Sequence, residues 1–378
     1  AVVVALASWV IVDHATGGHT HGLGDAASAG GHRHSGSPIA DDDPLLLEIR
    51  RAIDDGGTRA GLDLLERRVE ERPALRGMSH QYVHALGRYV YETSDDPARA
   101  FGSCDDRFEG GCYHGVLQGY FEDNPGFTAG DVAGLCDELG ADAGLDLEWQ
   151  CLHGLGHGLT LFFDHEVNRP LEYCDALGSN WDRRSCYGGV FMENVIWGQA
   201  LRSGQETIPG AAVLSDDPQY PCNQVDEAYR NDCWLMQSST ILDLVGWDFA
   251  AAFAECVRAP DAYVTTCHES MGRDIAGYTL HEVDRAAELC LLADDTWVAH
   301  CFSGAARQFV DWYAETGPAF ELCAAAPSGR EWLCHSAVAQ TADFYWRGDQ
   351  ERLRAECAKA GDRRWIESCE QAAGANAS

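Results

Sequence analysis

Short apolar segments recur along most of the chain, separated by polar turns. Residues 247–256 read WDFAAAFAEC and end on a cysteine, whereas residues 301–310 read CFSGAARQFV and begin with one. These patterns fit the first and the second helix of a helical hairpin, and they return about every 34 residues, the period of a two-helix repeat. The sequence therefore predicts an all-α fold, an α/α solenoid that coils as a right-handed superhelix of about nine helical hairpins, with a helical lead-in at Leu45–Asp54.

The 16 cysteines follow the same repeat. They fall into eight successive pairs, whose second members are 39, 35, 47, 34, 34, 33 and 35 residues apart. We expect each pair to form a disulfide between the end of the first helix and the start of the second, worth about 3 kcal/mol of stability. The predicted pairs are Cys104 with Cys112, Cys136 with Cys151, Cys174 with Cys186, Cys222 with Cys233, Cys256 with Cys267, Cys290 with Cys301, Cys323 with Cys334 and Cys357 with Cys369.

Paired cysteines in this number indicate an oxidising compartment. Zinc and iron–sulfur sites use short C-x₂-C spacings, and the sequence contains none. We therefore predict an extracytoplasmic protein, either secreted or anchored at the outer face of a membrane.

One repeat carries a family resemblance. Residues 104–119 show the pattern Cys-x₇-Cys-Tyr-x-Gly-x-Leu-x-Gly, which resembles the disulfide-stapled α/α repeats of secreted cysteine-rich proteins in the Sel-type repeat superfamily. The resemblance covers this repeat and implies an architecture that presents binding surfaces. It implies no site residues.

The N-terminal residues differ from the repeats. Residues 1–12 are uncharged and apolar, and we expect them to belong to a membrane anchor or a signal peptide. Residues 13–44 are mostly Gly, Ala, Ser, Asp and His, and they are predicted to form a disordered tether before the repeat domain of residues 45–378. Its histidines either bind Zn²⁺ or Cu²⁺ loosely or belong to a polar linker. They are His14, His19, His21, His32 and His34.

The net charge and the motifs of the sequence limit which classes of partner and site are expected. The net charge of −33 argues against nucleic acid as a partner and favours cations. The sequence contains no Gly-rich phosphate loop, no G-x-S-x-G and no H-E-x-x-H, so nucleotide-binding and standard hydrolase sites are not indicated. A membrane contact is expected only through the N-terminal segment.

Histidines recur at one position of successive second helices. His153 and His157 follow Cys151 by two and six residues, and residues four apart share one face of a helix. His114 follows its own cysteine by two residues. Three glycines around this histidine pair also fit close helix packing, which needs no metal.

A further histidine pair lies one period upstream. Met78 is 34 residues before Cys112. If Met78 takes the place of a cysteine, His80 and His84 follow it by two and six residues, as His153 and His157 follow Cys151. Such a column on the concave side of a solenoid predicts a transition-metal site, or two neighbouring sites. Its predicted ligands are His80, His84, His114, His153 and His157.

Other polar residues are weaker candidates. Glu193 is the best carboxylate ligand, because it lies beside the column in the next repeat. Less favoured, because they are typical of solvated helix ends, are Glu122, Asp123, Asp164 and His165. The long spacing before Cys233 predicts an insertion, roughly Arg202–Pro221, either a lid over the groove or a plain surface loop. Glu269, Arg273 and Arg307 are expected to form a salt-bridged groove surface.

The predicted function follows from the column. Imidazole ligands suit copper, zinc or iron, and the sequence does not choose among them. We predict an extracytoplasmic metal-binding solenoid, as a carrier or as a metal-dependent enzyme with redox or hydrolytic chemistry, whose groove can also take a protein or a small molecule. The alternative is a structural or protein-binding scaffold whose histidines line a wet groove without metal.

Overall fold

The chain forms an array of helices. A computed structural model describes residues 39–72, 75, 78–94, 96–105, 107–108, 110–137, 144–202, 215–346 and 348–375, and it contains no strand within those ranges. The helices are α1 Pro44–Gly56, α2 Thr58–Glu71, α3 Ser79–Glu92, α4 Pro97–Gly102, α5 Gly111–Asp123, α6 Ala129–Leu135, α7 Gly144–Phe162, α8 Asn168–Cys174, α9 Asn180–Arg202, α10 Glu227–Leu244, α11 Phe249–Val257, α12 Val264–Tyr278, α13 Val283–Cys290, α14 Val298–Tyr313, α15 Gly317–Ala324, α16 Glu331–Trp346, α17 Gln350–Ala358 and α18 Arg363–Ala375.

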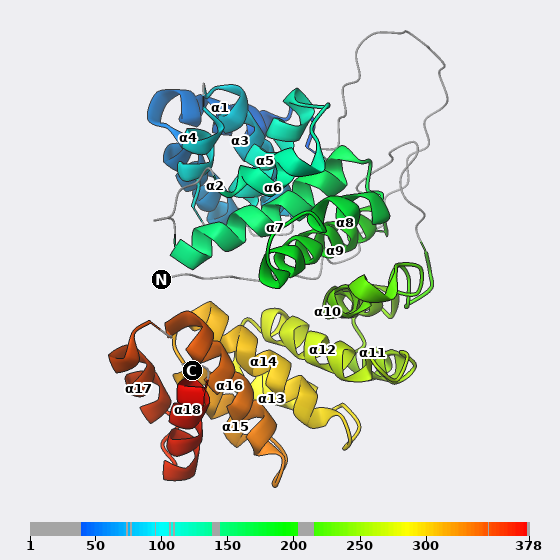
Figure 1. The fold of residues 1–378 in the computed structure, drawn as a ribbon, viewed down its shortest axis with the longest axis vertical. Coiled ribbons are helices and arrows are strands. Elements are labelled where there is room, and N and C mark those ends of the chain that lie inside the picture. Colours follow the sequence, from blue (N-terminus) through cyan, green and yellow to red (C-terminus); the bar gives the residue numbers. More distant parts are fainter. Residues whose placement is uncertain are drawn as a thin grey trace.

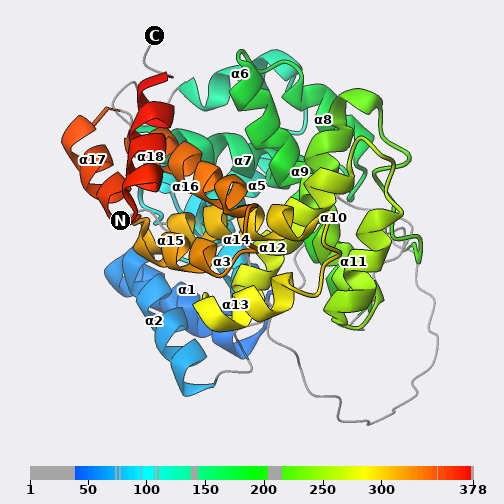
Figure 2. The same ribbon diagram turned by 90° about the horizontal axis from the view of Figure 1, so that it is seen from below.

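The array consists of hairpins, as predicted. Each of α4/α5, α6/α7, α8/α9, α11/α12, α13/α14, α15/α16 and α17/α18 pairs a first helix with a second helix, and α2/α3 precedes them. In the remaining unit, turns at residues 218–224 stand in place of a first helix before α10. Successive second helices pack side by side from α3 to α18, which confirms the helical solenoid. Figure 1 shows α1–α9 in the upper part of the molecule and α11–α18 in the lower part, with α10 joining them, and Figure 2 gives the view from below.

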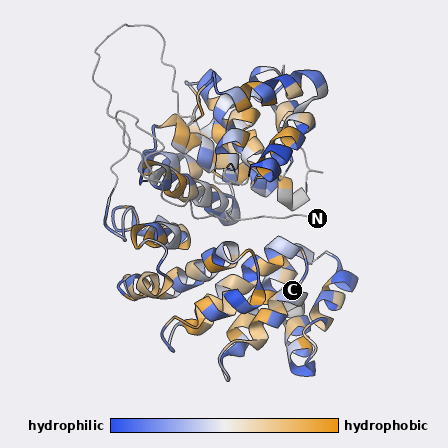
Figure 3. Ribbon diagram, turned by 180° about the vertical axis from the view of Figure 1, so that it is seen from behind, coloured by the Kyte–Doolittle hydropathy of each residue, from blue (hydrophilic) through white to orange (hydrophobic). Residues whose placement is uncertain are grey.

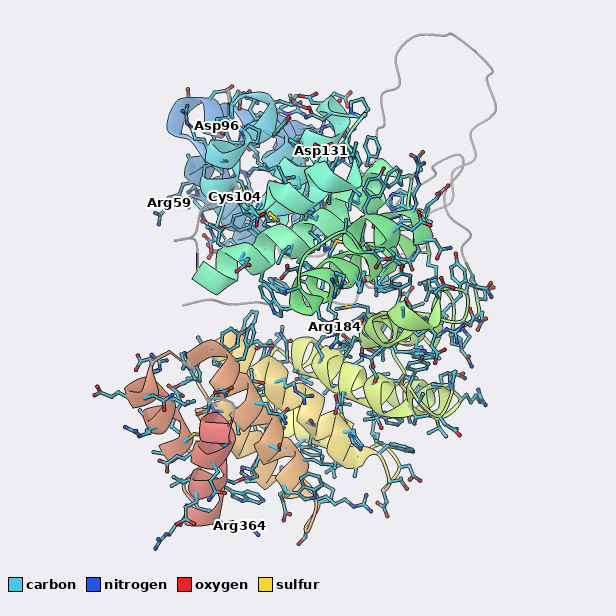
Figure 4. The ribbon with its side chains drawn as sticks, viewed as in Figure 1. Arg59, Asp96, Cys104, Asp131, Arg184 and Arg364 are labelled. Carbon is cyan, nitrogen blue, oxygen red and sulfur yellow. A yellow bond between two sulfur atoms is a disulfide. The ribbon has the colours of Figure 1, made fainter. Side chains whose placement is uncertain are left out.

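All eight predicted disulfides are present, and no free cysteine remains among the described residues. Cys104, labelled in Figure 4, follows α4 and is bonded to Cys112 at the start of α5, so the bridge joins the two helices of a hairpin at one end. This framework indicates an oxidising, extracytoplasmic environment. The other seven bonds, each confirmed as predicted, join Cys136 to Cys151, Cys174 to Cys186, Cys222 to Cys233, Cys256 to Cys267, Cys290 to Cys301, Cys323 to Cys334 and Cys357 to Cys369.

The second helices of the N-terminal half are buried on nearly every side. In α5, all residues from Gly111 to Gly119 are buried. A helix that is enclosed on all sides shows little separation of polar and apolar faces. Apolar and polar residues are accordingly interleaved on many helices in Figure 3. The histidines of α5 and its neighbours therefore lie inside the protein.

Glycines bring neighbouring second helices into close contact. A Cβ atom on Gly189 would lie 2.0 Å from the carbonyl oxygen of His153, and one on Gly304 would lie 1.8 Å from that of Glu269. Both carbonyls belong to the second residue after a cysteine. A Cβ on Gly115 would meet the carbonyl oxygen of His84 at 2.0 Å in the same manner.

The carbonyl of His84 thus makes the same contact as the carbonyls two residues after a cysteine. This corrects the predicted register of the first repeat. His84 takes the position that His153 has two residues after its cysteine, so Tyr82, not Met78, stands in the cysteine's place. The sequence had no cysteine here to anchor the alignment, and a shift of four residues preserves the helix face. His84 therefore stays in the predicted column, while His80 lies one turn earlier.

Two other predictions concern residues at or beyond the limits of the described ranges. The folded part begins before residue 45, because Ile39 is buried in the core and Asp43 caps α1 by accepting hydrogen bonds from the backbone N–H groups of Leu45 and Leu46. The predicted N-terminal segment, the tether histidines and residues 203–214 of the predicted lid lie outside the described residues.

Candidate metal centre

Four successive second helices bring the predicted ligands together. α3 carries His80 and His84, α5 carries His114, and α7 carries His153 and His157. Glu193 comes from α9. The exposed fractions of these six residues run only from 0% for His157 to 8% for His84, so the cluster is buried. The sequence column has become one buried cluster, which we call the histidine cluster.

The α3 side of the histidine cluster is tightly packed. The Nε2 atoms of His80 and His84 lie 3.0 Å apart, and Nδ1 of His114 lies 3.2 Å from Nε2 of His84. The Nε2 atom of His114 is buried and has no hydrogen-bond partner. Three buried imidazoles therefore direct nitrogens toward one another.

The α7 side repeats this arrangement. The Nε2 atoms of His153 and His157 lie 3.2 Å apart, and Nδ1 of His157 lies 2.7 Å from a carboxylate oxygen of Glu193. His114 connects the two sides, because its ring stacks on that of His157 with centroids 4.1 Å apart and an interplanar angle of 10°.

Backbone carbonyls determine where two rings carry their protons. Nδ1 of His80 lies 2.9 Å from the carbonyl oxygen of Phe108, and Nδ1 of His153 lies 3.2 Å from that of Ser185. A carbonyl oxygen only accepts, so both Nδ1 atoms donate, and Nε2 of each neutral ring then holds a lone pair. Such contacts orient metal-binding histidines in known sites.

The lone pairs of α7 face each other. When Glu193 is ionised it accepts from Nδ1 of His157, and Nε2 of His157 then bears a lone pair opposite that of His153. Two acceptors this close repel each other unless a cation or a proton relieves them. Tetrahedral zinc with Zn–N bonds of about 2.0 Å holds its ligand nitrogens about 3.3 Å apart. The observed spacing of 3.2 Å fits two ligands of one ion.

Burial keeps the imidazoles unprotonated. It lowers the pKa of His80 from 6.5 to about 4 and that of His157 to about 3. Burial, reinforced by repulsion among the rings, lowers the pKa of His84, His114 and His153 well below 6.5. At neutral pH the nitrogens are therefore available to a metal without loss of a ring proton. Burial also raises the pKa of Glu193.

Glycines leave room for the rings. A Cβ on Gly154 would lie 3.3 Å from Cδ2 of His114, and one on Gly188 would lie 3.4 Å from Nδ1 of His153. A Cβ on Gly111 would lie 3.2 Å from Nδ1 of His80. Close helix packing and ligand convergence, which the sequence presented as alternatives, are thus two results of one arrangement.

Of the remaining candidates, three lie near the surface, whereas His165 is close enough to Glu193 for their charges to interact. Glu122 pairs with Arg88 at 3.1 Å, and Asp123 and Asp164 are exposed. His165 is buried and stacks on Trp197 with ring centroids 3.8 Å apart.

Arg307 and Arg273, expected to form salt bridges in the later repeats, each pair with a carboxylate. Arg307 contacts Glu269 at 3.1 Å, and Arg273 contacts Asp274 at 2.6 Å.

Sequence reasoning missed the groups that orient the ligands. The carbonyls of Phe108 and Ser185 leave no residue-type signal, because every residue offers one. Trp149, whose ring stacks on His153 with centroids 4.5 Å apart, could have been found from its position four residues earlier on the same helix.

No protein-family model, curated protein or solved structure matches the chain, so the Sel-type resemblance stays a prediction. Among the described helices, none is long and apolar enough to cross a membrane.

Proposed function

We propose that the protein is an extracytoplasmic metal-binding solenoid whose histidine cluster holds a transition metal. The observation that carries this proposal is the pair of facing Nε2 atoms of His153 and His157, whose Nδ1 atoms are occupied by a carbonyl and a carboxylate. A cation between such nitrogens turns repulsion into coordination. The neutral rings and one carboxylate suit a monovalent or divalent transition-metal ion.

The donor set narrows the choice of metal. All 16 cysteines are in disulfides, so no thiolate takes part. Imidazole nitrogens with one carboxylate oxygen suit zinc, copper or iron, whereas calcium and magnesium prefer oxygen ligands. A metal bound here would supply a Lewis acid or, as copper or iron, a one-electron couple.

The protein itself would hold the metal ion, orient its ligands and enclose the site. Phe108 and Ser185 orient His80 and His153 through their carbonyls, Glu193 orients His157, and the packed second helices bury all of these side chains. Complete burial of the ligands favours retention of an ion or transfer of an electron over hydrolysis of a large substrate. We therefore propose a resident metal centre and place the protein-binding scaffold without metal second.

Elemental analysis of the full chain tests this proposal. The five tether histidines are replaced by serine in every sample, so that loosely bound metal does not contribute. The test variant combines His84→Ala with His157→Ala, which removes a ligand from each of the three groups of residues able to hold an ion. We expect metal that survives dialysis in the parent protein and almost none in the variant.

A control outside the cluster accompanies this comparison. His300, which is partly exposed and contacts Glu269, is replaced by alanine and should leave the metal content unchanged. Circular dichroism checks that each variant remains helical. A parent protein without bound metal, after growth with zinc, copper and iron, would overturn the proposal and favour the scaffold.

A further inference from the structure

The histidine cluster has the form of two clamps. His80 and His84 make one on α3, His153 and His157 make the other on α7, and each pair presents its Nε2 atoms at 3.0 or 3.2 Å. α5 packs against both helices and carries His114. Resting on the proposed function, we propose that the cluster holds two transition-metal ions, one in each clamp, with His114 between them.

The grouping of ligand atoms supports two ions. Three sets of residues have ligand atoms within 4.8 Å of one another, namely His80, His84 and His114; His114, His153 and His157; and His84, His157 and Glu193. His153 shares no set with His80 or His84. A single zinc or copper ion needs all of its ligands around one point. His153 and the two histidines of the α3 clamp do not surround a common point, so one ion does not use them all.

His114 is grouped with both histidines of each clamp. It belongs to the set of each clamp, and its Nδ1 atom faces His84 at 3.2 Å. Its Nε2 atom is buried without a hydrogen-bond partner, an arrangement that costs stability unless another group uses the lone pair or proton. An ion in the α7 clamp supplies such a group.

Electrostatics determines which clamp binds an ion first. Glu193, which contacts His157 at 2.7 Å, is the carboxylate of the histidine cluster, so the α7 clamp receives a negative charge at short range. In the α3 clamp, His84 is grouped with His157 and Glu193, but the carboxylate makes its direct contact with His157. An ion already in the α7 clamp also repels a second one in this buried site. We therefore expect the α7 clamp to fill first and the α3 clamp to bind more weakly.

Metal titration of the full chain with tether histidines replaced tests the two-ion proposal. Cu²⁺ is added to metal-free protein and followed by electron paramagnetic resonance. The signal should grow to one equivalent and then fall or broaden toward two equivalents, because neighbouring Cu²⁺ ions couple magnetically. Saturation at one equivalent with an undisturbed signal would overturn the proposal but leave a single-ion centre, whereas no binding would overturn the proposed function itself.

Clamp variants provide an independent measurement. The variant with His80→Ala and His84→Ala should keep one tightly bound Cu²⁺, and that with His153→Ala and His157→Ala should keep one that competing chelator removes at least tenfold more easily. Each should show the signal of an isolated ion. Loss of all metal in both folded variants would mean that the clamps serve one ion. If a variant does not fold, the titration of the parent protein with its clamps intact decides between one ion and two.

Discussion

Nδ1 of His157 and a carboxylate oxygen of Glu193 lie 2.7 Å apart and join α7 to α9 across 36 residues of sequence. Both side chains are buried, so the contact is made in a medium where charge is costly. It positions the ring whose other nitrogen faces His153. The contact thus links the packing of two repeats to the chemistry of the histidine cluster.

Replacing Glu193 by glutamine should weaken metal binding. Glutamine keeps the shape of the side chain but removes the negative charge, and loss of a carboxylate that orients a ligand histidine typically lowers affinity by about 10- to 100-fold. Competition with a chelator of known affinity measures the change. Glu122→Gln, on α5 and paired with Arg88, is the matched control. Equal affinities of the two variants would contradict the role of Glu193.

Gly189→Ala should disturb the histidine cluster through packing. The added Cβ would lie 2.0 Å from the carbonyl oxygen of His153, so α7 and α9 must separate, which moves His157 away from Glu193. We expect a loss of stability of about 1–3 kcal/mol from overpacking, together with a loss of bound metal.

Gly304→Ala provides the comparison for this prediction. It produces the same kind of clash, at 1.8 Å from the carbonyl oxygen of Glu269, but between α12 and α14. It should lower the denaturation midpoint to a similar degree and leave the metal content intact. Metal loss in both variants would show that general destabilisation, and not local geometry, empties the centre.

Removal of a distant disulfide should separate stability from metal binding. Replacing both Cys290 and Cys301 by serine opens a bridge with a sequence separation of 11 residues. The chain-entropy argument gives a loss of about 3 kcal/mol in the free energy of unfolding. Urea denaturation measures this loss, and elemental analysis should find the parent metal content. Peptide mapping without reduction would contradict the hairpin staples if it found bridges between different repeats.

The metal-free protein should lose stability in mild acid, in part through His281. Both ring nitrogens of His281 are buried without hydrogen-bond partners, and burial lowers its pKa from 6.5 to about 4. The unfolded chain therefore binds a proton that the folded protein does not. Stability is lost as the pH falls from about 6.5 to about 4, by about 3 kcal/mol for this group.

His281→Asn tests the acid sensitivity. Asparagine does not titrate, and it tolerates the left-handed backbone at this position, where φ is 59°. Its free energy of unfolding, measured in chelator at several pH values, should fall less steeply between pH 6.5 and 4 than that of the parent. Parallel curves for the two proteins would contradict the assignment.

The features that could be predicted from the sequence are local or periodic. The repeat and the disulfides were readable because cysteines fall at regular intervals, and a bridge of 8 to 15 residues closes within one hairpin. The bond between Cys323 and Cys334 and that between Cys357 and Cys369 follow the same rule at the far end of the array. His153 and His157 were recognisable as a clamp because the helix itself places residues four apart on one face.

Tertiary structure decided how the repeats meet. Without a cysteine in the first repeat, its register depended on the contact between Gly115 and the His84 carbonyl, which no spacing reveals. The same packing directs the carbonyls of Phe108 and Ser185 at His80 and His153 and thereby chooses which nitrogens keep lone pairs. Helical periodicity places side chains on faces, whereas distances between helices depend on contacts among residues far apart in the chain. The sequence by itself therefore determined which residues are available as ligands, and only the folded protein determined that they converge.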